Sequence, residues 1–92
     1  MTTTVANDAA GGRFIAYVDG AEAGSAYYEV EDGTITFTHT EVGDEFEGKG
    51  VGGALAKHAL DDSRAKDLRV VARCPFIAGW IERHPDYGDL VA

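Results

Sequence analysis

The segment Thr34-Ile-Thr-Phe-Thr-His-Thr-Glu-Val-Gly-Asp-Glu-Phe-Glu-Gly-Lys-Gly-Val-Gly-Gly53 carries the clearest structural pattern in the chain. Its first part alternates threonine with larger side chains, which is the two-residue period of a β-strand. That period places Ile35, Phe37 and His39 on one face of the strand and the threonines on the other. We therefore expect residues 34–42 to form a strand within a sheet.

A glycine-rich turn then leads into a helix. From Gly50 onward, Val51, Leu55 and Ala59 recur at four-residue intervals. This spacing predicts an amphipathic helix that ends near Lys66. The small Gly and Ala residues of its apolar stripe favour a close approach of the helix to the sheet.

Other turn signals divide the flanking sequence. Asp19-Gly20 and Asp32-Gly33 each separate two extended stretches and therefore predict hairpin turns. The expected elements are strands at 13–18, 26–31, 34–42 and 68–72, a helix from Gly50, and a second helix at 75–84. This order predicts one α+β domain of residues 1–92, in which two helices pack against a mostly antiparallel, twisted sheet behind a loose N-terminal lead-in.

The composition argues against several classes of protein. A net charge of -8 opposes binding to nucleic acid, whose phosphates attract clusters of Lys and Arg. One cysteine, Cys74, excludes an internal disulfide, and residues 1–7 lack the basic and apolar regions of a secretory signal. The apolar runs are too short to cross a bilayer. We therefore expect a cytoplasmic protein, monomeric or weakly dimeric, that binds neither nucleic acid nor membrane.

The glycine-rich turn at residues 48–53 has two interpretations. Free N–H groups and the dipole at a helix start attract phosphate, and glycine leaves room for a pyrophosphate. Alternatively, the glycines form a tight turn with close packing of helix on sheet. Glycine alone does not separate these two interpretations.

Two nucleotide-binding motifs nearly match the same region. Residues 43–49 have the Walker A spacing, but the following Gly50 has no hydroxyl for magnesium. Gly48, Gly50 and Gly53 match GxGxxG, but neither the parallel strand-helix-strand unit nor the later acidic residue of a dinucleotide site is evident. A magnesium-dependent nucleotide hydrolase is therefore a remote interpretation, and no metal site is expected.

Residues 47–52, Glu-Gly-Lys-Gly-Val-Gly, resemble the acetyl-CoA signature of the GNAT acetyltransferase superfamily, which is Arg or Gln, two residues, Gly, one residue, then Gly or Ala. Residues 38–42 before it, with residues 74–76 and 81–87 after it, are similar to the small single-domain branch of that superfamily. The chain departs from the signature at Glu47, which would repel a diphosphate. It is also too short for the two helices that larger members place after their first strand.

The resemblance implies a sheet that splays at the cofactor strand and binds acetyl-CoA as co-substrate. It implies an N-acetyltransferase acting on a primary amine of a small molecule or protein. The alternative is a noncatalytic acyl-CoA sensor or interaction module. The residues that the resemblance assigns to coenzyme A are Val42, Glu47, Gly48, Lys49, Gly50, Val51, Gly52 and Gly53, with a backbone N–H near Val42 holding the thioester oxygen.

Three side chains are candidates for catalysis by the same resemblance. Glu41 or His39, on one strand face, could accept a proton from the amine, although each could instead be a solvated or packing residue. Cys74 precedes a helix start and could protonate the departing thiolate, accept the acetyl group covalently, or be a buried apolar residue. The residues 76, 77, 80 and 81 fall on helical spacing and are expected to pack in the core and seal the cleft.

Overall fold

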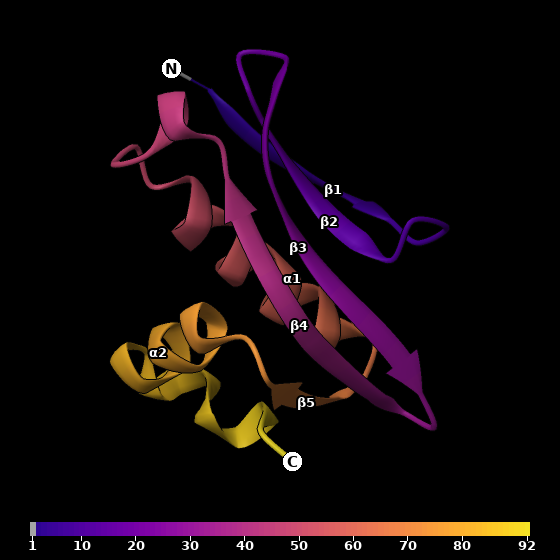
Figure 1. Cartoon of the computed structure of the whole chain (residues 1–92). Coiled ribbons are helices and arrows are strands. Elements are labelled where there is room, and N and C mark those ends of the chain that lie inside the picture. Colours follow the sequence, from indigo (N-terminus) through magenta and orange to yellow (C-terminus); the bar gives the residue numbers. More distant parts are fainter. Residues whose placement is uncertain (1) are drawn as a thin grey trace.

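Five strands lie side by side in one sheet, in the order in which they occur along the chain (Figure 1). The computed structural model describes residues 2–92. The strands are β1 (Thr3–Asp8), β2 (Arg13–Val18), β3 (Ala21–Glu31), β4 (Thr34–Val42) and β5 (Arg69–Ala72). Neighbours from β1 to β4 are antiparallel, whereas β5 runs parallel to β4. The predicted α+β class with a mostly antiparallel sheet is therefore confirmed.

Two α-helices and two short 3₁₀-helices accompany the sheet within residues 2–92. They are η1 (Asp44–Phe46), α1 (Val51–Ala65), α2 (Pro75–Arg83) and η2 (Pro85–Leu90). α1 connects β4 to β5 and contacts all five strands, while α2 packs beside β4 and β5. β4, α1 and β5 thus form a parallel strand-helix-strand unit, which was not evident from the sequence.

The N-terminal region forms an edge strand, so the prediction of a loose lead-in is wrong. β1 pairs with β2, with Val5 opposite Ala16, and Val5 packs against the core. The strand has only this one larger apolar side chain, so it leaves almost no hydrophobic period in the sequence. β3 also begins earlier than predicted, because Asp19 and Gly20 both adopt positive φ, as a two-residue hairpin turn requires.

The core lies between the sheet and α1. Phe14 and Phe37 from the sheet and Leu55 and Leu60 from α1 are fully buried. The predicted stripe of α1 is buried throughout, and Ala59 within it lets the helix lie close to the strands. Truncation of a buried leucine in such a core costs about 2–5 kcal/mol. The sheet and the helix therefore hold each other in place, and with them the turn between β4 and α1.

A β-bulge in β4 reverses the alternation of side chains after Phe37. Phe37 and His39 pair with consecutive residues of β3, so Thr38 is an extra residue without a partner. Phe37 is consequently buried and His39 exposed, while Thr40 turns toward the interior. The prediction that His39 shares a face with Ile35 and Phe37 is wrong, because one inserted residue moves every later side chain to the opposite face.

Candidate active site

β4 and β5 separate where β5 ends. Their pairing stops at Phe37 and Ala72, and the Phe37 carbonyl accepts hydrogen bonds from the N–H groups of Arg73 and Cys74, each at 3.0 Å. β5 then leads into α2, while β4 continues to Val42 (Figure 1). The splayed sheet that the family resemblance implies is therefore present.

The backbone of Val42 lies at the opened edge of β4. The next N–H, that of Gly43, donates to the Ala23 carbonyl of β3 at 2.8 Å. Successive amides along an extended strand point to opposite edges. The Val42 N–H is therefore directed to the edge that β5 has left, where it can donate to a carbonyl oxygen.

The turn between η1 and α1 requires glycine for its backbone conformation. Gly48 has a φ of 76° and Gly50 a φ of 77°, and this left-handed region costs other residues about 1–2 kcal/mol. A Cβ at either position would meet no atom within 4 Å. Gly50 caps α1, and its carbonyl accepts from Ala54 at 3.0 Å, so the N–H groups of residues 51–53 precede the helical hydrogen-bonding pattern.

These amides line a cleft of about 440 Å³, the turn cleft. Its lining consists of Val42, Phe46, Glu47, Gly48, Gly50, Val51, Gly52, Gly53 and Phe76. The first turn of α1 contains no acidic residue, so its dipole and free donors favour an anion there. The chemistry of this donor set fits the diphosphate and pantetheine of coenzyme A.

Gly52 has a different role from Gly48 and Gly50. A Cβ at Gly52 would lie 2.7 Å from Cζ of Phe76, so this glycine permits close packing of α1 on α2. Both interpretations of the glycine-rich turn therefore hold, but for different glycines. Phe76 itself is 39% exposed and borders the turn cleft, whereas Ile77, Trp80 and Ile81 are buried as predicted.

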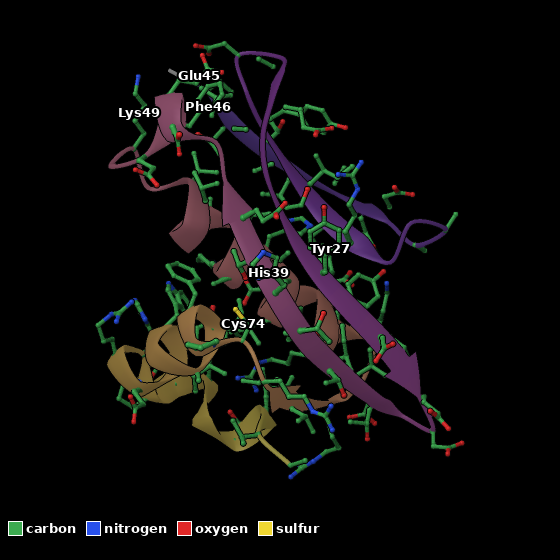
Figure 2. The ribbon with its side chains drawn as sticks, viewed as in Figure 1. Tyr27, His39, Glu45, Phe46, Lys49 and Cys74 are labelled. Carbon is green, nitrogen blue, oxygen red and sulfur yellow. The ribbon has the colours of Figure 1, made fainter. Side chains whose placement is uncertain are left out.

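Two of the predicted coenzyme-binding residues differ from the rest. Lys49 does not line the turn cleft, and its side chain extends from the turn away from Cys74 (Figure 2). Glu47 does line the cleft and is exposed. Its carboxylate opposes an anionic ligand, so the backbone amides supply the attraction.

Cys74 is 3% exposed and is the N-cap residue of α2. Its Sγ lies 3.2 Å from Oγ1 of Thr40, a distance at which either atom can donate. The bulge at Thr38 is responsible, because it turns Thr40 toward the interior. Cys74 thus belongs to the hydrophobic core and lies at the point where β4 and β5 separate (Figure 2).

Glu41 and His39 lie together but on the other side of β4 from Cys74. His39 Nε2 is 3.2 Å from Oε1 of Glu41, and both side chains are 61% exposed. The imidazole stacks on the ring of Tyr27, with centroids 6.2 Å apart and an interplanar angle of 20°. The structure therefore brings together the two predicted bases and separates them from the predicted thiol.

A second cavity, of about 570 Å³, lies on the face of the sheet that α1 does not cover; we call it the open-face pocket. Side chains that line it include Arg13, Glu22, Ser25, Tyr27, Glu41 and Glu47. Arg13 and Tyr27 each neighbour a core residue along their strand, Phe14 and Ala26 respectively, and point to the opposite face. Sequence reasoning did not identify this pocket, because its residues come from three strands and the turn.

Arg13 is the basic residue of the open-face pocket. It donates from Nη1 to Oγ of Ser25 at 3.0 Å, and its guanidinium lies 3.7 Å from Asp8 and 3.8 Å from Glu22. Desolvation lowers the pKa of Arg13, but Glu22 and the other anionic neighbours outweigh it and leave the pKa raised. Arg13 therefore stays charged and partly neutralises this side of the pocket.

The described residues also bear on metal, dinucleotide and membrane sites. Within residues 2–92, no three His, Cys, Asp or Glu side chains lie close enough together to hold a metal ion. β5 is followed by Arg73, so the acidic residue that binds ribose after the second strand of a dinucleotide site is absent there. Within the same range, no helix is long and apolar enough to cross a membrane.

Two curated proteins are similar to part of the chain. Protein NATD1 of Xenopus tropicalis is 36% identical over 59 residues, which cover 64% of this chain and 54% of that protein. Protein NATD1 of Bos taurus is 37% identical over 51 residues, which cover 55% of this chain and 45% of that protein. The chain therefore spans about half the length of the curated relatives it matches.

A solved structure and a family model cover nearly the whole chain. A solution NMR structure of a GCN5-like protein from Staphylococcus aureus superposes with a TM-score of 0.74 at 25% identity, over 97% of this chain and 87% of that one. The family model described as GCN5-related N-acetyl-transferase matches residues 13–90. On this match, the chain belongs to the GCN5-related N-acetyltransferase family.

Proposed function

We propose that this protein transfers the acetyl group of acetyl-CoA to a primary amine. The observation that carries the proposal is the position of the Val42 N–H, at the opened edge of β4 and bordering the turn cleft. One donor for a carbonyl oxygen and a row of donors for phosphate thus occur along a single groove. That combination fits a thioester at one end and a diphosphate at the other.

The turn holds the diphosphate through its main chain. N–H groups of residues 51–53 are the free donors of α1, and the left-handed Gly48 and Gly50 leave open space above them. Phe76 borders the same cleft and supplies an apolar wall for the pantetheine arm. Glu47 opposes this binding, so the affinity for coenzyme A is lower than that of a chain with Arg or Gln there.

Acetyl-CoA supplies an activated acetyl group: the amine nitrogen forms a bond to the thioester carbon, the carbon–sulfur bond breaks, and the amine loses one proton while the thiolate gains one. The Val42 N–H stabilises the negative charge that develops on the carbonyl oxygen. Loss of one such donor costs about 100- to 1000-fold in rate in comparable sites. Glu41, paired with His39, takes the proton of the amine on the open face of the sheet.

Cys74, which lies where β4 and β5 separate, returns a proton to the thiolate. The Thr40 hydroxyl holds the thiol through the 3.2 Å contact between Oγ1 and Sγ. The thiol is 3% exposed, and burial favours proton donation over covalent acetylation, because a nucleophile must reach the carbonyl carbon. Thr40 acts here as a positioning residue.

The proposal extends to the domain and its location. One hydrophobic cluster joins the sheet to both helices, which supports a single acetyltransferase domain of residues 1–92. Cys74 is a free thiol, and a reducing cytoplasm suits it.

A noncatalytic acyl-CoA sensor is the second candidate, and Glu47 favours it. A carboxylate that weakens coenzyme binding is a cost for an enzyme, whereas a sensor can use low affinity to respond to concentration. The sensor predicts binding without transfer to any acceptor. Turnover therefore separates the two candidates.

Thermal unfolding with coenzyme A, acetyl-CoA or magnesium ATP tests the binding step. A ligand present at 100 times its dissociation constant adds about 2.7 kcal/mol to the free energy of unfolding, so we expect only the two coenzyme A compounds to raise the melting temperature. Release of free thiol from acetyl-CoA in a panel of amines then tests transfer. No release of thiol with any amine, despite clear binding of acetyl-CoA, would favour the sensor.

A further inference from the structure

The open-face pocket and the turn cleft meet at the end of β4. Val42 and Glu47 line both cavities. An amine that occupies the open-face pocket therefore lies next to the carbonyl that we assign to the Val42 N–H. The candidate base, Glu41, lines the same pocket.

The charges of this pocket are unequally compensated. Glu22 is neutralised in part by Arg13 at 3.8 Å, and Glu41 lies 3.2 Å from His39. Glu47 takes part in none of the ion pairs formed within residues 2–92. A carboxylate without a counter-charge therefore stands where the two cavities join.

The size of the pocket restricts what it can hold. Its volume of about 570 Å³ lies within the range of roughly 300–1,000 Å³ typical of small-molecule sites. The buried Ser25 and the ring of Tyr27 line its floor, so the space is a hollow in the sheet face and accommodates a short aliphatic chain.

We infer that the open-face pocket is the acceptor pocket and that Glu47 selects a small aliphatic amine carrying a second positive charge. The inference rests on the proposed function and adds the acceptor class to it. One nitrogen loses its proton to Glu41 and is acetylated; the other stays protonated and pairs with Glu47. The residue that departs from the family signature thus weakens coenzyme binding and strengthens acceptor binding.

The test compares two acceptors of equal chain length, 1,5-diaminopentane and n-pentylamine, in steady-state acetyl transfer. We expect kcat/KM to be about tenfold higher for the diamine, a difference worth about 1.4 kcal/mol. In Glu47→Gln the preference falls to about twofold, while the Kd of acetyl-CoA decreases because a repulsive charge is gone. A residue that merely supports the turn is not expected to weaken the preference for the diamine and, at the same time, strengthen the binding of acetyl-CoA.

Glu45→Gln is the matched control. Glu45 is exposed, lies two positions earlier in η1 and lines neither cavity (Figure 2). The substitution removes the same charge from the same region and should leave the ratio of the two acceptors unchanged. Equal loss of preference in Glu45→Gln would overturn the assignment, because the effect would then come from net charge.

Other outcomes separate this inference from the proposed function. Equal kcat/KM for the two amines, or acetylation of a lysine-rich peptide without acetylation of the diamine, would overturn the inference and leave the transferase intact. If no amine is acetylated, amide NMR titration of the coenzyme-loaded protein with 1,5-diaminopentane decides the case. Shifts at Ser25, Glu41 and Glu47 that disappear in Glu47→Gln would support diamine binding in the open-face pocket without acetyl transfer. The absence of shifts would overturn both the acceptor pocket and the proposed transfer.

Discussion

The Thr40 hydroxyl lies 3.2 Å from the Cys74 thiol, and a single bulged residue in β4 makes this contact possible. Without the extra Thr38, the strand would keep its period and turn Thr40 to the open face. The bulge thus gives the end of β4 two chemically distinct sides. Thr40 and the thiol face the core, while Glu41 and His39 face solvent.

The first prediction concerns this contact. Cys74→Ala should lower kcat at least tenfold, because general acid catalysis contributes about 100- to 10,000-fold in enzymes, and it should leave the Kd of acetyl-CoA unchanged. Thr40→Val, which keeps the shape of the side chain, should lower kcat less. Rapid-mix kinetics with binding measured separately checks both, and unchanged turnover in Cys74→Ala would remove the thiol from the mechanism.

The second prediction uses two glycines with the same backbone conformation. Gly50 and Gly33 both have a φ of 77°, and a Cβ at either would meet no atom within 4 Å. Gly50→Asp and Gly33→Asp should therefore lose similar stability, about 1–2 kcal/mol. Only Gly50→Asp should weaken coenzyme A binding, by at least about tenfold, because only Gly50 lies in the turn cleft. Isothermal titration of the two variants makes the comparison, and equal loss of binding would contradict it.

The third prediction concerns the packing of α1 on α2. Gly52→Ala should destabilise the protein by about 1–3 kcal/mol, as expected for an overpacked contact, because its Cβ would lie 2.7 Å from the Phe76 ring. Phe76→Ala removes that obstacle, so the double variant should recover part of the loss. A double-mutant cycle from urea unfolding measures the coupling. Additive effects would mean that the two residues do not touch in solution.

The fourth prediction concerns the loss of folding stability at acidic pH. The pKa of Asp61 is lowered, chiefly by a hydrogen bond from Lys57 at 2.9 Å. Desolvation opposes this shift, and a hydrogen bond from Tyr87 at 2.7 Å adds to it. A carboxyl whose folded pKa lies below its unfolded value of about 3.9 contributes stability above that pH and loses it as the pH falls through the folded pKa.

Asp61→Asn should therefore flatten the decrease in stability between neutral pH and pH 3. The effect should stay below about 1 kcal/mol, since exposed ion pairs contribute little. Asp32→Asn, which removes an exposed carboxylate in the turn between β3 and β4, is the control for the loss of one negative charge. Chemical denaturation at a series of pH values distinguishes them, and identical curves for wild type and Asp61→Asn would refute the prediction.

Much of the fold was predictable because local patterns and tertiary structure agree. The two-residue period that ends at Phe37 and the four-residue spacing of Val51, Leu55 and Ala59 each describe a buried face. Glycine at 48 and 50 likewise signals its own conformation, since the backbone there has positive φ. Such features depend on few distant residues.

The remaining features depend on tertiary contacts that have no local sequence pattern. The bulge at Thr38 follows from the register of β4 with β3. Thr38 belongs to an alternating series of threonines that is equally compatible with a regular strand, so the sequence does not indicate the bulge. β1 is held by pairing with β2 rather than by its own pattern. In the sequence, Phe76 does not differ from the other apolar residues of α2. Its position beside the turn cleft depends on close packing against Gly52 of α1.

The central claim is that acetyl-CoA lies along the opened edge of β4 and over the N-terminus of α1. Amide NMR titration of the protein with acetyl-CoA tests it most directly. We expect the largest shifts at the N–H groups of Val42 and of residues 50–53, with Gly33 unaffected. Saturable binding that leaves Val42 and residues 50–53 unshifted would contradict the claim.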